Sequence, residues 1–309
     1  MIPAPSGGFI AALPFAWSKA MHFLVFSVVC SVLVSVLLKL SPRRGIDIAQ
    51  AVTWNYLAAS VLSLLLLKPS LQSLQGGHAP WPALLGLAVA LPGIFLVLAR
   101  AVREAGIVRS DVAQRLSLLL SLLAAFALFG EPANGWKLTG LALGLLAIIG
   151  VSARNGEAGN AVAGSWRWLL AVWAGFALID VMLKQVALSG TPSTAALLVS
   201  FALAFVLMLV WQVQRHISGK ARLTVRNLGY GLLLGVINFG NILFYVRAHQ
   251  ALPHSPATIF AGMNIGVVCL GALVGVLAFG EKTSHWNRAG LALAVVAIAL
   301  IAYGARLPA

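Results

Sequence analysis

Charged residues are scarce in this sequence. Only 9% of the 309 residues are Asp, Glu, Lys or Arg, whereas 61% are hydrophobic and the mean hydropathy is +0.96. A soluble protein of this length needs a polar shell around its core, and so few charges cannot build one. The composition therefore excludes a soluble globular domain and indicates a chain embedded in lipid.

Acidic residues are the rarest of the charged types. Seven Asp and Glu residues stand against 21 Lys and Arg residues, giving a formal net charge of +14. In a soluble protein this excess would suggest a nucleic-acid partner. Here the cations lie in short breaks between apolar runs, where they set orientation and contact anionic headgroups. We therefore expect membrane lipids and a small-molecule solute as partners and no nucleic acid; the sequence leaves a homodimer open.

Motifs of common enzymes and pumps are also lacking. There is no phosphate-binding Gly-x-x-x-x-Gly-Lys-Ser/Thr loop, no His-Glu-x-x-His and no serine nucleophile elbow. The two cysteines, Cys30 and Cys269, lie inside apolar runs without metal-ligand spacing. We therefore expect no cofactor, no metal and no catalytic residues, and we do not expect an enzyme.

Long apolar runs make up most of the chain. A membrane-spanning helix needs about 20 mainly apolar residues, and cutting the sequence at charges, prolines and loop-like clusters leaves runs close to that length. Residues 1–20 lack a convincing cleavage pattern, so we interpret the first run as a retained helix. The predicted helices cover 21–40, 48–67, 82–101, 112–129, 138–152, 168–187, 194–213, 228–249, 258–279 and 289–303.

A repeat divides the chain into two halves. A Gly-Glu pair, a Trp and a Gly occur twice with the same spacing, at Gly130-Glu131, Trp136 and Gly140 and at Gly280-Glu281, Trp286 and Gly290. Each half holds five predicted helices, an odd number, so the second half must enter the membrane from the opposite side. The sequence therefore predicts an all-α integral membrane protein of about ten transmembrane helices in two inverted five-helix repeats. The expected segments are an N-terminal segment 1–20, a first repeat 21–152, a connecting loop 153–166, a second repeat 167–304 and a C-terminal tail 305–309.

The repeated motif carries a resemblance. Leu128-Phe129-Gly130-Glu131, a following Trp and a Gly-rich last helix in each half resemble the EamA-type ten-helix members of the drug/metabolite transporter superfamily, from about Met21 to Gly304. The resemblance implies a carrier with a central cavity lined mainly by its first, third, fourth, sixth, eighth and ninth helices. It implies no single substrate.

Polar residues at membrane depth are the candidates for a site, because each ionisable one costs about 2.5–3.5 kcal/mol to insert. The candidate substrate-binding residues are Arg115, Gln114, Arg100, Asn238, Asn241, Tyr245 and Asn264. Candidates for coupling or gating are Asp180 and Lys184, spaced i, i+4, and Lys39. Interhelical hydrogen bonds, a structural ion pair and a snorkelling lysine remain open as alternatives.

Arginine is the most informative of these residues. Arg115 is the most deeply placed cation on a helix that the resemblance puts at the central cavity. Arg100 and Arg103 end the preceding helix on the same membrane face, so we expect three guanidiniums to converge on an anionic solute. In the competing interpretation, Asp111 and Glu104 neutralise these arginines and lock the two helices together. For Glu131 and Glu281, beside helix-end glycines, we favour capping or pairing over proton relay.

These patterns favour a secondary transporter that moves a small polar or amphipathic metabolite by alternating access. An anionic or zwitterionic solute such as an amino or organic acid is the expected class. A non-transporting scaffold or sensor and a lipid-handling membrane enzyme are the alternatives. The expected location is the bacterial cytoplasmic (inner) membrane.

The distribution of cations predicts the orientation of the chain. Most of the 21 Lys and Arg residues lie on the face reached after the odd-numbered helices, and cytoplasmic loops carry the excess of cations. Both termini should therefore face away from the cytoplasm, although relatives with cytoplasmic termini are described. A fluorescent protein that matures only in the cytoplasm should stay dark when it is fused to the C-terminus, and bright cells would reverse the orientation.

Overall fold

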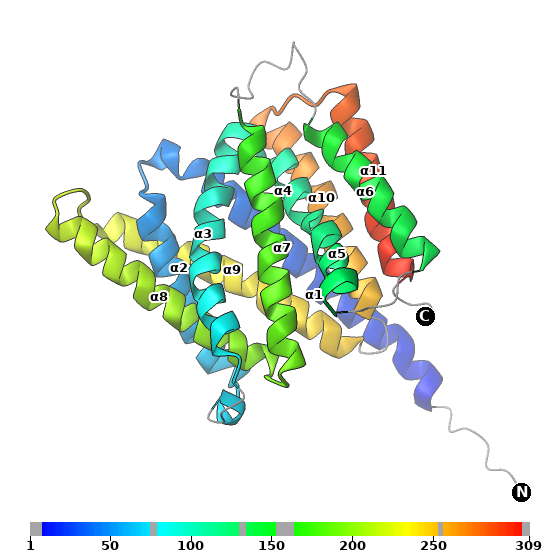
Figure 1. Ribbon diagram of the computed structural model, residues 1–309, viewed down its shortest axis with the longest axis horizontal. Coiled ribbons are helices and arrows are strands. Elements are labelled where there is room, and N and C mark those ends of the chain that lie inside the picture. Colours follow the sequence, from blue (N-terminus) through cyan, green and yellow to red (C-terminus); the bar gives the residue numbers. More distant parts are fainter. Residues whose placement is uncertain (1–7, 75–78, 130–133, 153–163, 253–255, 305–309) are drawn as a thin grey trace, which may run out of the picture.

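The structure is a computed structural model that describes residues 8–74, 79–129, 134–152, 164–252 and 256–304 (Figure 1). Within these residues all the regular secondary structure is helical. A π-helical stretch, Ser63–Leu67, continues α2, and two short 3₁₀ turns lie in the loops. The α-helices are α1 (Gly8–Leu40), α2 (Ile48–Leu62), α3 (Trp81–Ala105), α4 (Ile107–Arg115), α5 (Ser117–Phe129), α6 (Gly135–Ser152), α7 (Trp166–Leu188), α8 (Ser193–Ile217), α9 (Val225–Ala251), α10 (Pro256–Phe279) and α11 (His285–Gly304).

The predicted ten-helix membrane fold is confirmed. Nine helical segments of the described residues are long and apolar enough to cross a membrane, and a shorter apolar helix, Gly135–Ala147, lies in α6. Helices α4 and α5 together make one of the nine, Ile107–Leu128. At the N-terminus, α1 reaches back to Gly8, beyond the predicted start at residue 21. Most of the predicted connecting loop and the whole predicted tail lie outside the described residues.

The helix predicted over 112–129 is divided in the structure. It begins earlier, at Ile107, and is interrupted at Leu116. The predicted start at residue 112 follows from cutting the sequence at charges such as Arg109 and Asp111, whereas both are buried among other helices. The interruption has a local cause: the Leu116 carbonyl accepts a hydrogen bond from Trp173 Nε1 of α7 at 2.8 Å. A side chain that bonds a carbonyl in this way breaks the regular helical ladder.

The two halves pack in matching ways. Helix α1 lies against α9 and α10, just as α7 lies against α3 and the α4–α5 pair. Helix α2 packs on α9 as α8 packs on α3, and α6 and α11 pack on each other. In Figure 1, α1 rises from the lower right whereas α7 descends from the top. The second half is therefore inverted relative to the first, as the odd number of helices in each half predicts.

Small residues bring α9 close to α2, as the Gly-x-x-x-Gly spacing predicts. A Cβ atom added at Gly231 would lie 2.6 Å from the Ala51 carbonyl oxygen, and one at Gly235 would lie 2.6 Å from the Asn55 carbonyl oxygen. Both neighbours are backbone atoms and cannot turn aside. Glycine therefore allows the two helices to approach without any hydrophobic drive between them.

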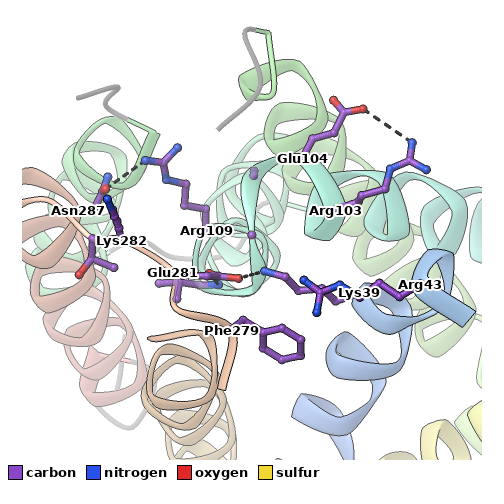
Figure 2. A pocket seen from close by; sticks show the side chains of 13 residues that line it. Lys39, Arg43, Arg103, Glu104, Arg109, Phe279, Glu281, Lys282 and Asn287 are labelled. Carbon is purple, nitrogen blue, oxygen red and sulfur yellow. Dashed lines mark hydrogen bonds and ion pairs between the residues drawn. The ribbon is translucent and has the colours of Figure 1, made fainter. Parts of the chain in front are cut away.

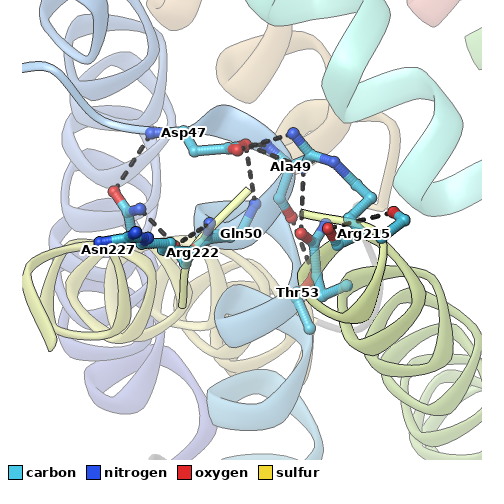
Figure 3. Close-up of polar contacts among 9 residues, drawn as sticks. Asp47, Ala49, Gln50, Thr53, Arg215, Arg222 and Asn227 are labelled. Atoms are coloured by element: carbon cyan, nitrogen blue, oxygen red, sulfur yellow. Dashed lines mark hydrogen bonds and ion pairs between the residues drawn. The ribbon is translucent and has the colours of Figure 1, made fainter. Parts of the chain in front are cut away.

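Asp47 ties three helix ends together on one membrane face (Figure 3). Its carboxylate caps α2 by accepting from the Ala49 N–H at 2.9 Å, and it pairs with Arg215 at the end of α8, also at 2.9 Å. Its backbone N–H donates to Asn227 Oδ1 at the start of α9, at 3.1 Å. The Asn227 amide donates in turn to Gln50 Oε1 at 2.9 Å. This network holds α2, α8 and α9 in register.

The contact between α9 and α2 can be tested with alanine. Gly231→Ala should destabilise the purified protein by about 1–3 kcal/mol, because the new methyl group meets backbone atoms of α2. Gly229→Ala is the matched control on the same helix, since nothing lies within 4 Å of a Cβ added there. The measurement is thermal unfolding in detergent, and equal melting temperatures for both variants would contradict this packing.

Candidate functional site

A cavity of about 480 Å³ lies among α4, α5, α7, α9 and α10. It lies toward the membrane face where α7 and α9 end and α10 begins. Its aromatic and sulfur-bearing walls include Phe176, Phe260 and Met263. Most of the polar residues chosen from the sequence line it: Gln114, Arg115, Asp180, Lys184, Asn241, Tyr245 and Asn264.

Arg115 ends α4 and presents its guanidinium at the inner part of this cavity. Its Nη2 donates to Ser31 Oγ of α1 at 2.7 Å, while its buried Nε has no hydrogen-bond partner. Within the described residues no carboxylate forms an ion pair with it. A guanidinium with spare donors is prepared to bind an acceptor in the cavity.

An acid faces the same cavity from α7. Asp180 is exposed there, and its Oδ2 accepts from Ser121 Oγ at 2.7 Å. Lys184 lies one turn further along α7 and also lines the cavity. Two amides complete the walls: Asn241, whose Oδ1 accepts from Ser27 Oγ at 2.8 Å, and Asn264 of α10. The cavity thus offers positive, negative and neutral polar groups to one bound molecule.

A side chamber of about 170 Å³ adjoins the cavity and shares Gln114, Phe176, Asn241 and Ile242 with it. Asn238 lines this chamber and not the larger cavity. The stripe predicted on α9 is therefore divided: Asn241 faces both spaces, Asn238 the chamber alone and Tyr245 the larger cavity alone.

The opposite side of the bundle is closed by Glu281 (Figure 2). Its carboxylate pairs with the Lys39 ammonium of α1 and accepts from the Ile107 and Val108 N–H groups, at 2.7 and 3.1 Å. These N–H groups begin α4, where the helix leaves its first donors unsatisfied and favours negative charge. A Cβ added at Gly106 would lie 2.6 Å from Glu281 Oε2, so a glycine there lets the acid reach the helix.

Glu281 therefore caps and pairs, as the sequence predicted, although the helix that it caps is α4. It joins α1, α4 and the end of α10 through one carboxylate. Lys39 does not reach the cavity; its ammonium lies 4.9 Å from the centre of the Phe279 ring on the closed side. Glu131, the repeat-related acid, lies outside the described residues.

The expected convergence of three arginines is not found. Arg100 pairs with Glu104 and lies over the Trp168 ring, 5.6 Å from its centre, with about half of its side chain exposed. Arg103 lines a pocket of about 210 Å³ on the closed side, together with Lys39 and Arg109. The position of a residue along its helix does not set the direction in which the side chain points, because that direction depends on the rotation of the helix about its own axis. Of the three, only Arg115 lines the cavity.

Sequence reasoning missed a stripe of serines on α1. Ser27, Ser31 and Ser35 follow one another at intervals of four residues, so they share one face of the helix. Each bonds a polar residue of another helix: Asn241, Arg115 and, at 2.8 Å, Asp111. The regular spacing of three hydroxyls in an apolar helix was the signal that could have found them.

These observations define a multi-pass membrane protein with a polar cavity between two inverted halves. The EamA-like transporter family matches residues 18–153. A Haemophilus influenzae protein, named only as uncharacterized, is 39% identical over 289 residues, which are 92% of this chain and 98% of that protein. A crystal structure that shares 18% identity has the same fold, with a TM-score of 0.56 over 92% of this chain and 96% of that one. The chain belongs to the EamA-like transporter family.

Removal of the Glu281 carboxylate tests the closed side. Glu281→Ala should destabilise the protein by about 3–5 kcal/mol, because Lys39 loses its counter-ion and two N–H groups of α4 lose their acceptor. Lys282→Ala, at the exposed neighbouring position, is the control and should unfold like the parent. If thermal unfolding does not distinguish the two variants, Glu281 does not hold the helices together.

Proposed function

We propose that this protein is a secondary transporter for a small solute that carries both a carboxylate and an ammonium group, such as an amino acid. The observation that supports the proposal is the placement of Arg115 and Asp180 in one cavity at membrane depth. Placing a guanidinium and a carboxylate at membrane depth is costly, and a solute that pairs with both offsets the cost.

The chemistry of each wall suits one end of such a solute. The planar guanidinium of Arg115 can bind a carboxylate with two parallel hydrogen bonds. Asp180 keeps acceptor capacity beyond its bond with Ser121 and can receive an ammonium. The amides Gln114, Asn241 and Asn264 supply neutral partners. A volume of about 480 Å³ lies within the usual range of ligand cavities.

In alternating access, the closed side must open to release the solute. A packed apolar cluster that includes Leu38, Leu98 and Ile107 lies on that side, beside the Lys39–Glu281 pair. For solute to leave there, these contacts must separate while the helices around the cavity close. The cations of the closed-side pocket support a cytoplasmic position for that face by the positive-inside rule, which assigns the cavity to the other side of the membrane in this proposal.

Exchange of solute across proteoliposomes tests this function. Preloaded vesicles should exchange labelled members of a panel of L-serine, L-leucine, L-phenylalanine, L-glutamate and succinate. Arg115→Gln should raise the half-saturating concentration of the best substrate by about 10–100-fold. This change corresponds to the loss of about 1.5–3 kcal/mol of binding free energy from a hydrogen bond to a charged group.

The matched control is Arg100→Gln, which removes an arginine outside the cavity and should leave exchange unchanged. Melting temperatures of both variants separate a binding defect from misfolding. If the Arg115→Gln variant exchanges every solute at the same rate as the parent protein, Arg115 does not bind the solute carboxylate. If the parent exchanges no member of the panel, this transport function is wrong.

A second substitution tests the ammonium end. Asp180→Asn should weaken exchange of the amino acids far more than exchange of succinate, which has no ammonium group to lose a partner. Equal effects on both classes would remove Asp180 from the solute site.

A further inference from the structure

Asp111 is a buried acid that the function above does not use. It lies on α4 with 2% of its surface exposed, between α1 and α10. Its Oδ1 accepts from Ser35 Oγ at 2.8 Å, whereas its buried Oδ2 has no hydrogen-bond partner. The carboxyl group lies against the backbone of Gly271, where any added Cβ would collide with Oδ2. A carboxylate oxygen left without a partner at membrane depth costs free energy that a bound proton removes.

No ion pair joins Asp111 to a cation of the described residues. The charges that act on it most come from Arg115, one turn further along α4, and Glu281 at the end of α10. Glu281 already has Lys39 as its counter-ion. The remaining ionisable groups on helices that pack against α4 are Arg109 on α4 itself, Lys19, His22 and Cys30 on α1, Arg100, Arg103 and Glu104 on α3, Lys137 on α6, Asp180, Lys184 and Arg167 on α7, and Cys269 on α10.

Asp111 lies between the two aqueous sides of the bundle. On one side, Ser35 both lines the side chamber and donates to Asp111, so it joins the carboxyl group to the cavity. On the other side, Val108 and Arg109, less than one turn earlier on α4, line the closed-side pocket. A group in this position can receive a proton from the cavity and release it after the closed side opens.

We propose that Asp111 binds the proton whose movement drives solute transport, which rests on the transport function proposed above. The proton comes from water and binds to the carboxylate of Asp111, and it returns to water on the other side. No other bond changes. The carrier is the side chain itself, moving with α4 between the two states.

The position of Arg115 sets the direction of coupling. Ser31 and Ser35, one turn apart on α1, bond Arg115 and Asp111 separately, so the two charges balance without forming a pair. A solute carboxylate that binds Arg115 takes up the positive charge that stabilises the Asp111 anion. Proton binding is then favoured when solute is bound. Solute and proton therefore cross together, in the same direction.

Infrared spectroscopy tests the proton site without any solute. Asp47, Asp111 and Asp180 are the aspartates of the sequence, so the double variant Asp47→Asn plus Asp180→Asn leaves Asp111 alone to carry a carbon-13 label. Acidification should produce the labelled carbonyl band of a protonated carboxyl group. The triple variant that adds Asp111→Asn should lack the band. If the double variant shows no such band down to mildly acidic buffer, Asp111 does not bind the proton.

Proteoliposomes test the coupling. With acid outside, the parent should accumulate the best amino acid of the panel above its equilibrium level, and entrapped pyranine should report acidification. Asp111→Asn should lose both signals yet keep solute exchange, which needs no net proton movement. Asp47→Asn, the control, keeps a capping side chain for α2 and should retain all three activities.

The outcomes are separable. Accumulation by Asp111→Asn equal to that of the parent overturns the proposal, as does loss of exchange in a variant that folds normally. If Asp111→Asn does not fold, the double variant still decides the infrared test, because Asp111 is intact there. If the parent exchanges no solute, the transport function fails, whereas the infrared result still shows whether Asp111 binds a proton.

Discussion

Polar side chains at membrane depth must find their partners inside the protein, and the centre of this bundle is organised by that requirement. Lipid offers no hydrogen bonds, so each buried donor or acceptor needs a neighbouring helix or an aqueous cavity. The serines of α1 supply partners for Asn241, Arg115 and Asp111 in turn. Helix α1 therefore presents a line of serine hydroxyls that bond side chains of α4 and α9, and the polar cavity forms beside it.

The same requirement explains the two ends of α4. At its start, the unsatisfied N–H groups are bonded by Glu281, whose negative charge is in turn balanced by Lys39. At its end, the helix is interrupted where Trp173 bonds the Leu116 carbonyl. Asp111 and Arg115 lie between these two attachments, so side chains of other elements fix both ends of the segment that carries the two charges.

Much of the cavity could be predicted from single residues. Arg115 was identified because a cation so far inside an apolar run needs a reason, and Gln114 and Asn264 because they occupy equivalent positions in the two halves. Arg100 was wrongly grouped with Arg115, since depth along a helix axis does not tell where a side chain points around it. Asp111 was treated mainly as a neutralising neighbour, because nothing in the sequence shows that Ser35 and Gly271 surround it.

The sequence by itself determined the membrane class, the approximate ten spans and the inversion of the halves. These follow from the length of the hydrophobic runs, the composition and the odd number of helices in each repeat. All three can be read from the chain without knowing which segments meet in space. Only the tertiary structure decided which acid meets which cation, which glycine faces which backbone and which polar groups share a cavity. Such pairings depend on the rotation and crossing of helices far apart in sequence, as when Glu281 reaches across to Lys39 and the first N–H groups of α4.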